Sequence, residues 1–315
     1  MQSLSSATLI KNLPNPHLLD RLNAFAKSRG VQLYLVGGSV RDLLLNRAIT
    51  DLDFAIAHDA ISFAKAFADH VGGAFVPLEE QPPTARIVLR ETRLVLDFAQ
   101  FRAETLEADL RLRDLTINAI ALDFSLLLTQ TAVNLMDPCN GFRDLEAGLL
   151  HFPGEQVVLD DALRLLRAYR FAAQLGFDMP EATIDLIRRH KARLSQVSPE
   201  RIRDEFIKIL DVTNAATYLR QMDETRLLSQ IIPEIEGMRG VQQNDYHHLD
   251  VWEHTLLALD MFEAKPMPHA LQPYHTEIQG YLREPLLYDK RRQPIIKLAL
   301  LLHDVAKPVT KTISP

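Results

Sequence analysis

The sequence of 315 residues contains one cysteine and no long apolar segment. A lone Cys139 cannot form a disulfide within the chain, which excludes a disulfide-stapled secreted domain and suits a reducing compartment. The chain has no run of about 18 apolar residues, and its first residues lack the basic-then-apolar order of a signal peptide. We therefore expect a cytoplasmic protein without a membrane span.

The chain also lacks a large excess of basic residues, since its formal net charge is −6. Taken alone, this argues against a nucleic-acid partner. The charges are unevenly spread, however: the segment from Arg164 to Arg203 holds nine lysines and arginines against four acids, a surplus of five. Such a local surplus is typical of phosphate-backbone binding, with an ordinary solvated helix surface as the alternative.

What is present indicates a folded chain of two or three domains, since 47% of residues are apolar and 24% are charged. No internal repeat is found. A helix is expected over 61–71 and a loop over 265–285. Strands are predicted over 31–36, 51–56, 74–78, 85–90 and 93–99, the last two as a hairpin, and later helices over 159–175, 180–193, 199–211, 214–221, 224–230, 250–263 and 294–306.

The segment 33–56 carries the strongest chemical signal. An apolar strand leads into Gly37 and Gly38, then a helix, a breaker region, and a second strand with Asp51 and Asp53. Alternate side chains of a strand share a face, so both carboxylates point the same way and repel each other unless a cation lies between them. Mg²⁺ suits such a pair, and glycines at a helix start let the backbone approach a phosphate. The alternative is a capping aspartate followed by a surface charge.

Together these features resemble the DNA polymerase β-like nucleotidyltransferases, specifically the class II tRNA nucleotidyltransferases and bacterial poly(A) polymerases. Further segments recur in the order of that family over roughly residues 20 to 210. They are 106–110 (LEADL), 112–119 (LRDLTINA), 137–145 (DPCNGFRDL), 160–167 (DDALRLLR) and 198–202 (SPERI).

The resemblance implies an α+β fold: a nucleotidyltransferase head with a small mixed sheet, then an all-helical neck and body, then a helical region similar to HD phosphohydrolases. We expect the head over 1–150, the base-selecting and RNA-binding body over 151–235, and a truncated HD-like region over 236–315.

The catalytic residues implied are Asp51, Asp53 and Asp97, with Asp51 and Asp53 holding Mg²⁺ in a two-ion mechanism and Mn²⁺ as the alternative ion. Asp97 stands in an apolar strand, where a carboxylate is costly unless it is paired or metal-bound; an edge-strand charge facing water is the alternative. The family usually has glutamate there. The candidate nucleotide-binding residues are Gly37, Gly38, Arg41, Arg113, Asn118, Asp161, Arg164, Arg167 and Arg170.

Asp161 and Arg164 are spaced three apart on a predicted helix and can present an acceptor and a donor side by side. That pair fits the pairing edges of cytosine and adenine and rejects uracil and guanine. A plain salt bridge on the helix is the alternative. This chain departs from the family at Asp160, where glutamate is usual, and at Leu112, where a second arginine is usual.

The linker after the Asp97 strand is short, with only residues 103–105 between Arg102 and the LEADL segment. Full CCA-adding members of the family resemble one another in carrying a longer flexible segment at this place. The resemblance therefore favours addition of the two C residues to the tRNA 3′ end from CTP. A separate A-adding enzyme would then complete the end. Full CCA addition with ATP is the second reading. An A-adding enzyme or a poly(A) polymerase comes third, and residues 91–94 lack the basic motif of bacterial poly(A) polymerases. No DNA partner is expected.

Three residues suggest a different activity, because His254, His303 and Asp304 resemble the start of an HD metal-phosphohydrolase pattern. The pattern needs a further aspartate, and the eleven residues after Asp304 contain none. His247 and His248 are poorly placed to replace it. A phosphohydrolase with an inert head and a catalytically dead RNA-binding module thus remain as alternative classes.

Overall fold

The computed structural model describes residues 3–241, 249–264, 269–287 and 290–310. Contacts divide the chain into two compact units, Met1–Val157 and Val158–Pro315, which we describe separately. His247, His248 and residues 265–268 lie outside the described residues. Within the described part, no helix is both long and apolar enough to cross a membrane.

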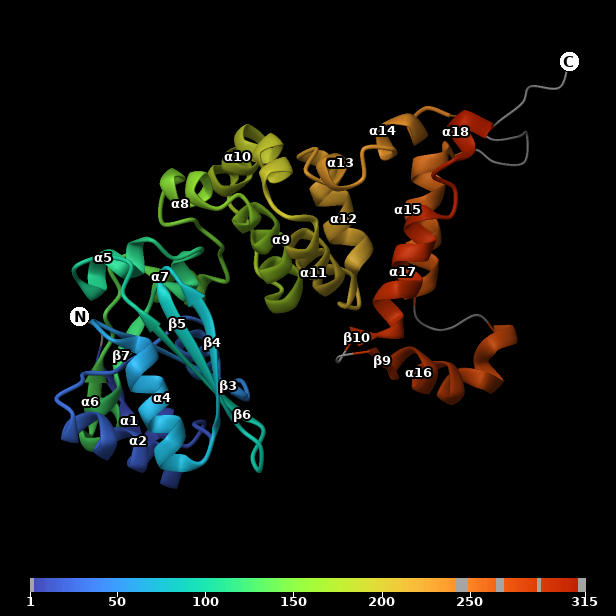
Figure 1. The fold of residues 1–315 in the computed structure, drawn as a ribbon. Coiled ribbons are helices and arrows are strands. Elements are labelled where there is room, and N and C mark those ends of the chain that lie inside the picture. The colour runs from blue at the N-terminus through green and yellow to red at the C-terminus, as the bar shows by residue number, and fades with distance from the viewer. Residues whose placement is uncertain (1–2, 242–248, 265–268, 288–289, 311–315) are drawn as a thin grey trace, which may run out of the picture. The chain divides into compact units, whose positions relative to one another are not determined.

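The first unit is built on a six-stranded sheet in the order β4-β5-β6-β3-β2-β7 (Figure 1). β3 and β6 are parallel, while the other pairs are antiparallel. The strands are β2 (Tyr34–Val36), β3 (Asp51–Ile56), β4 (Ala74–Glu80), β5 (Pro83–Leu89), β6 (Leu94–Gln100) and β7 (Ala121–Asp123), and a separate pair joins β1 (Ser3–Ser5) to β8 (Ala132–Asn134).

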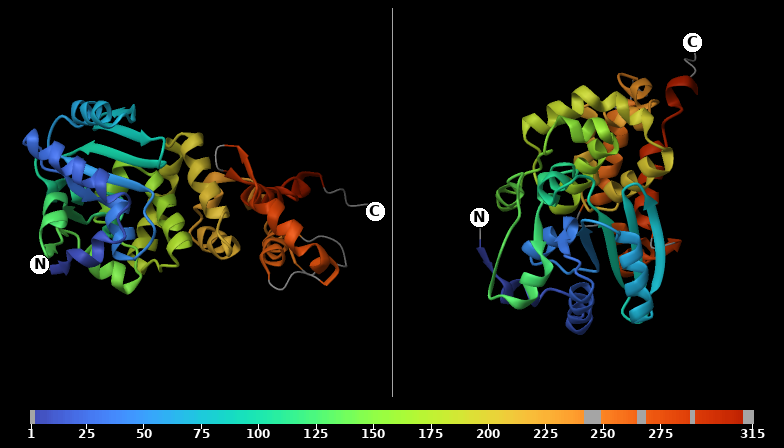
Figure 2. Two further views of the ribbon diagram at one scale, coloured as in Figure 1. Left: turned by 90° about the horizontal axis from the view of Figure 1, so that it is seen from below. Right: turned by 60° about the vertical axis from the view of Figure 1, so that its left-hand side comes forward.

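α4 packs on β4, β5 and β6, and Figure 2 shows this helix, in light blue, beside the cyan strands. The helices of the first unit are α1 (Ser6–Ile10), α2 (Pro16–Ser28), α3 (Gly37–Leu44), α4 (Ala60–Val71), α5 (Leu106–Arg111), α6 (Phe124–Thr129) and α7 (Gly141–Ala147), with a 3₁₀ turn η1 (Thr116–Asn118) and α8 (Glu155–Asp160) at the end.

Strand alternation determines which sheet face becomes the core. Leu52 and Phe54 of β3 are fully buried, and Phe54 stacks on Phe98 of β6 at a centroid distance of 5.2 Å. Phe63 of α4 packs on Phe98 from the same side. The odd-numbered residues therefore point to the opposite face, which carries Asp53 and Asp97.

The predicted strands of the head are confirmed, with β3 matching its predicted bounds and the 85–90 and 93–99 hairpin formed by β5 and β6. The helix over 61–71 is α4, and Gly72 ends it with φ +72°. β7 was not predicted from the sequence because all three of its residues are buried, so it shows no alternation.

The second unit is helical over most of its described length. Its helices are α9 (Leu163–Leu175), α10 (Glu181–His190), α11 (Pro199–Leu210), α12 (Ala215–Glu224), α13 (Leu228–Ile231), α14 (Ile235–Met238), α15 (Val251–Glu263), α16 (His275–Arg283), α17 (Arg292–Leu302) and α18 (Lys307–Thr310), with 3₁₀ turns η2 (Lys191–Gln196) and η3 (His269–Tyr274) and a short pair β9 (Pro285–Leu287) and β10 (Lys290–Arg291).

Several predictions for this unit are wrong. The helix expected over 224–230 is interrupted, because α12 ends at Glu224, Arg226 has a φ of +61°, and α13 begins only at Leu228. The loop expected over 265–285 is largely η3 and α16 in its described part, where Pro273 stands inside the 3₁₀ turn and Pro285 follows the end of α16. The single helix over 159–175 is two helices: α8 ends at Asp160, and α9 begins at Leu163. Asp161 lies in the break, where its carboxylate accepts the Leu163 N–H.

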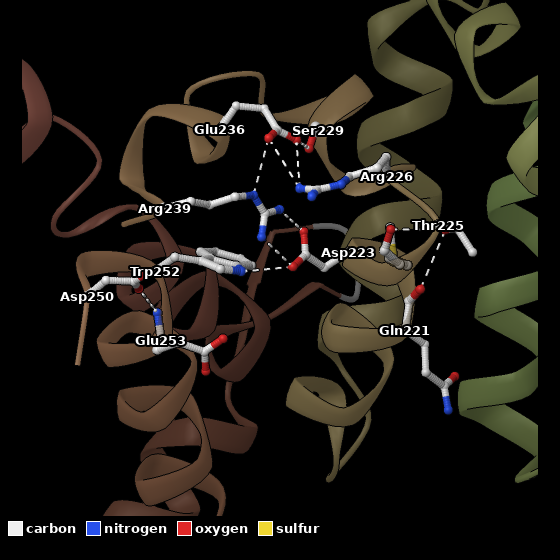
Figure 3. Close-up of polar contacts among 11 residues, drawn as sticks. Gln221, Asp223, Thr225, Arg226, Ser229, Glu236, Arg239, Asp250, Trp252 and Glu253 are labelled. Atoms are coloured by element: carbon white, nitrogen blue, oxygen red, sulfur yellow. Dashed lines mark hydrogen bonds and ion pairs between the residues drawn. The ribbon is translucent and has the colours of Figure 1, made fainter. Parts of the chain in front are cut away.

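A polar network joins α12 to α13, α14 and the start of α15 (Figure 3). Asp223 accepts hydrogen bonds from both terminal nitrogens of Arg239 and from the indole N–H of Trp252 at 2.9 Å. Glu236 accepts hydrogen bonds from Ser229, Arg226 and Arg239, which lower the pKa of its carboxyl group. Trp252 and Asp223 are thus tied together although 29 residues separate them.

A buried ion pair holds α15, α17 and the start of α12 together. Lys297 is fully buried, with its ammonium 2.5 Å from Glu263 and hydrogen-bonded to the Val212 carbonyl. Glu263 also accepts the backbone N–H groups of Ala215 and Ala216, the first residues of α12. One carboxylate therefore neutralises a buried cation and caps a helix.

Replacing Glu263 by alanine should cost about 3–5 kcal/mol of unfolding free energy, because Lys297 is left as a buried charge without its carboxylate. Lys297→Met should cost less, since Glu263 keeps both α12 N–H donors. Urea unfolding followed by the fluorescence of Trp252, the only tryptophan, measures both values. The matched control is Glu253→Ala on the same helix, whose exposed pair with Arg220 spans 3.6 Å and should contribute about 0–1 kcal/mol. Equal losses for Glu263→Ala and Glu253→Ala would contradict this account.

Candidate active site

Three neighbouring strands place the candidate catalytic residues at one level of the sheet. β3 and β6 run parallel with Asp53 directly opposite Asp97, and β5 places Arg86 opposite Asp97 from the other side. The strand that carries Asp97 therefore lies beside the strand that carries Asp51 and Asp53. Asp51 lies at the first residue of β3 and is exposed.

The charge of Asp97 and the burial of the site both act on the carboxyl group of Asp53. Burial, followed by the negative charge of Asp97, raises the pKa of Asp53 above its ordinary value, while Arg113 and Ser39 act in the opposite direction. The dominant effects thus disfavour the ionised form of Asp53 in the absence of a cation. A cation bound beside Asp53 would reverse that balance.

Ser39 fastens the first turn of α3 to β3. The Asp53 N–H donates to the Ser39 hydroxyl oxygen at 2.7 Å, and that hydroxyl lies 3.2 Å from Asp53 Oδ2 and 3.1 Å from the Asp51 carbonyl oxygen. Sequence reasoning missed this residue. The available signal was its position directly after the glycine pair, on the buried face of the helix start.

The glycine pair lies against the charged side chains. Gly37 has φ +66°, and a Cβ there would stand 3.2 Å from Arg113 Nη1 and 3.5 Å from Asp53 Oδ2. A Cβ at Gly38 would stand 3.5 Å from Arg41 Nη2. Glycine is thus required at position 37 by backbone conformation and by the close approach of Arg113, whereas a Cβ at position 38 would make only ordinary contacts.

Both of these arginines are held by acidic or amide partners. Arg113 donates through Nε and Nη2 to Asp109, a buried carboxylate, while Nη1 lies beside Gly37. Arg41 is buried and donates to Asn118 at 2.8 Å as well as to its neighbour Asp42. The Asn118 amide in turn donates to Asp114 at 3.0 Å, so Asn118 orients Arg41 in this structure.

Asp97 has a partner that sequence reasoning did not identify. Arg86 donates to both of its oxygens, through Nε and a terminal nitrogen, each at 2.8 Å. The bidentate geometry satisfies the requirement that a carboxylate in an apolar strand be paired. The sequence alone did not indicate Arg86, because its contact with Asp97 depends on the register in which β5 pairs with β6.

The predicted base-selecting residues belong to the second unit. The Asp161 carboxylate accepts two hydrogen bonds from the guanidinium of Arg201, in the SPERI segment, at 2.7 and 3.3 Å. It also accepts the Leu163 N–H at the start of α9. The backbone N–H of Arg164 donates to the Asp161 carbonyl oxygen at 3.1 Å, so the two residues are adjacent. Arg201 is a second residue that spacing alone did not reveal.

The other two predicted arginines of α9 face Glu205 of α11. Arg170 is 11% exposed and hydrogen-bonded to Glu205, and its guanidinium carbon lies 3.8 Å from the centroid of the Phe171 ring. Arg167 is 31% exposed, with its Nη1 3.8 Å from the same carboxylate. Arg167 is therefore the more accessible of the two.

The three HD-like residues also come together. His254, His303 and Asp304 place one potential ligand atom each within 4.8 Å of one another. Lys307 stands close to them, with its ammonium 2.6 Å from Asp304 Oδ2. An ammonium at that distance competes with a divalent ion for the carboxylate.

Comparisons with known proteins agree with this arrangement. Residues 33–151 match the family model of the poly A polymerase head domain, and residues 176–238 match that of the probable RNA and SrmB-binding site of polymerase A. A solved tRNA nucleotidyltransferase, complexed with a primer tRNA and an incoming ATP analog, is similar with a TM-score of 0.69 at 27% identity, over 90% of this chain and 75% of that one.

Curated relatives differ in the nucleotide named. The chain is 34% identical to a CC-adding tRNA nucleotidyltransferase of Thermus thermophilus, over 89% of this chain and 58% of the relative. It is 35% identical to an A-adding enzyme of Deinococcus radiodurans (88% and 57%) and 30% identical to a multifunctional CCA protein of Neisseria gonorrhoeae (90% and 77%). The chain spans about half the length of the first curated relatives it matches. With its head fold and these matches, the chain belongs to the tRNA nucleotidyltransferase family that shares the poly A polymerase head domain.

Proposed function

We propose that the protein is a template-independent nucleotidyltransferase that adds CMP from CTP to the 3′ end of tRNA, building the C-C portion. The observation that carries this proposal is the register of β3 and β6, which sets Asp53 opposite Asp97 beside the glycine turn. Membership in the family supports the reaction class. Its relatives include CC-adding, A-adding and CCA proteins, so the C-C stage rests on the features below.

Asp51 and Asp53 are the proposed ligands of Mg²⁺, with Mn²⁺ as a substitute. The donor set fits a hard cation because it consists of carboxylate oxygens, and because burial and the charge of Asp97 raise the pKa of Asp53, an effect that a bound cation would offset. Bound there, the ion would neutralise charge on the triphosphate and on the attacking oxygen.

The remaining steps fall to residues of the head. We assign the triphosphate to the N–H groups at the start of α3 and to Arg113 Nη1, which lies beside Gly37. Asp97 accepts the hydrogen bond of the tRNA 3′-hydroxyl and takes its proton. The 3′-oxygen then bonds to the α-phosphorus, and pyrophosphate leaves.

Base selection is assigned to Asp161 and Arg164, with Asp161 accepting from the cytosine amino group and Arg164 donating to ring N3. The Arg201 interaction supports this role, because it fixes the Asp161 carboxylate while leaving acceptor positions open. Arg167 and Arg170 are proposed for phosphate or a neighbouring base, Arg170 requiring release from Glu205. The head over 1–150 would thus be catalytic, and residues 151–235 base-selecting and RNA-binding, followed by an HD-like region over 236–315.

Arg164→Ala should relax the choice of CTP over UTP by about 10- to 100-fold, since a site built to hydrogen-bond its ligand rejects analogues through unpaired polar groups. The measurement is kcat/KM for each nucleotide on a tRNA lacking its 3′ end. Arg203→Ala, which removes an exposed arginine paired with its neighbour Asp204, is the matched control. Unchanged discrimination in Arg164→Ala would show that another group distinguishes the bases.

The C-C stage is supported by the linker between β6 and α5. The linker holds residues 101–105, and its end is fixed because Thr105 caps α5 by accepting the Ala108 N–H. Asp109 accepts the Arg102 N–H at 3.0 Å and also binds Arg113. A change in the linker would therefore disturb the proposed triphosphate arginine.

One incubation tests the overall proposal. A tRNA lacking its 3′ end is supplied with CTP alone, ATP alone or both, and the products are resolved on a sequencing gel. Extension by two nucleotides with CTP alone is the expected result. Absence of extension under every condition would refute the function.

A further inference from the structure

The position of Arg86 beside Asp97 is set by the pairing of β5 with β6. Arg86 lies on β5, directly opposite Asp97, while Asp53 lies opposite Asp97 on β3. Asp97 is thus flanked at the same level by a carboxylate on one strand and a guanidinium on the other. The Arg86 side chain keeps 41% of its surface exposed, against 19% for Asp97, so the pair borders solvent.

The charge of Arg86 is fixed by these neighbours. The hydrogen bonds to Asp97 raise the pKa of the guanidinium further, and the charges of Asp51 and Asp53 add to the effect. Arg86 therefore acts as a permanent cation beside the third carboxylate.

The contacts of Asp97 leave room for a hydroxyl donor and disfavour a divalent ion. Each carboxylate oxygen offers about two acceptor positions. Arg86 occupies one on each oxygen, so positions remain for a hydroxyl donor. A divalent ion at Asp97 would instead meet the repulsion of the guanidinium, whose hydrogen bonds go to Asp97 rather than to Asp51 or Asp53.

Building on the proposed nucleotidyl transfer, we propose that Arg86 is a positioning residue that fixes Asp97 as the acceptor for the tRNA 3′-hydroxyl and reserves the divalent ion for Asp51 and Asp53. In the reaction the hydroxyl proton passes to Asp97, the 3′-oxygen bonds to the α-phosphorus, and the bond to pyrophosphate breaks. Arg86 keeps its protons throughout and touches neither substrate.

Two measurements on Arg86→Met have expected results of opposite sign. The kcat for CMP addition should fall about 10- to 100-fold with the KM for CTP within about 3-fold, because Asp97 loses its orientation but nucleotide contacts stay. Mn²⁺ affinity, measured by calorimetry without nucleotide or tRNA, should rise several-fold, because a competing positive charge is removed. Arg86→Lys keeps the charge without the fork, so its Mn²⁺ affinity should stay near wild type while kcat recovers only in part.

Matched controls separate this role from a general loss of structure. Arg90→Met removes an exposed arginine from the same hairpin and should change neither quantity. In an Asp97→Asn background, Arg86→Met should cause no further fall in kcat, because Arg86 acts through Asp97.

The proposal is overturned if Arg86→Met weakens Mn²⁺ binding together with kcat, or leaves kcat unchanged. A further loss of kcat in the Asp97→Asn background would also overturn it. Failure of the proposed function is distinguishable, because the wild-type protein would then extend no tRNA while the Mn²⁺ titrations still report on the charge of Arg86.

Discussion

Asp53→Ala should lower the rate of nucleotide addition by on the order of 10³-fold or more, and Asp51→Ala by a similar factor. The reason is geometric. Asp53 is the carboxylate that faces Asp97, the Arg113 guanidinium and the glycine turn, so its removal takes away the proposed metal ligand nearest to the other reacting groups. Single-turnover addition of CMP at saturating Mg²⁺ measures the loss.

The control for this substitution is Asp59→Asn, at an exposed aspartate between β3 and α4. Asparagine tolerates the positive φ of 59° at that position, so the fold is not strained. Asp53→Asn keeps the shape of the side chain and should be as inactive as Asp53→Ala. Near-normal nucleotide transfer by the Asp53→Ala protein would show that this carboxylate is not required for the reaction.

The same variants separate the alternative classes. A phosphohydrolase activity that survives Asp51→Ala and disappears in His254→Ala would belong to the cluster formed by His254, His303 and Asp304. A protein that binds tRNA but neither transfers nucleotides nor hydrolyses phosphate esters would be the RNA-binding module. The nucleotidyltransferase reading requires activity that is lost with Asp51.

The sequence predicted the carboxylates of the head correctly as neighbours because they depend on local rules. Asp51 and Asp53 share a face by strand alternation, and glycine before a helix marks a tight turn. The fold class followed from the motif order of the family. Gly37, Gly38, Asp51 and Asp53 lie within about 20 residues of one another, so their arrangement needs no knowledge of long-range register, whereas the position of Asp97 opposite Asp53 depends on the pairing of β3 with β6.

The partners of these residues were beyond such reasoning. Arg86 meets Asp97 only because the hairpin has one particular register, and Arg201 meets Asp161 across 40 residues. The break in the helix at Asp161 was hidden as well, because apolar spacing continues through it into α9. Long-range ion pairs depend on packing that periodicity does not specify.

The second large effect that we predict concerns how many nucleotides the protein adds. We expect efficient addition of two C residues and addition of A to a C-C end about 10²-fold slower or absent. Asp161 and Arg164 can pair with either base, so hydrogen bonding does not exclude ATP. Adenine is larger than cytosine and requires the pair to be re-aimed, and the linker 101–105 has little chain with which to adjust. Its contacts to Asp109, which also holds Arg113, restrict it further.

The measurement follows each of the three additions separately, using tRNA ending before the first C, after one C and after both. Inserting the longer segment of a CCA-adding relative between Arg102 and Leu106 should restore part of the A addition while leaving C addition and the catalytic carboxylates intact. An insertion of equal length made of glycine and serine is the control, since it adds chain without the relative's contacts. If the unmodified protein completes C-C-A at comparable rates for all three steps, the linker does not set the stopping point, and the protein is a full CCA-adding enzyme.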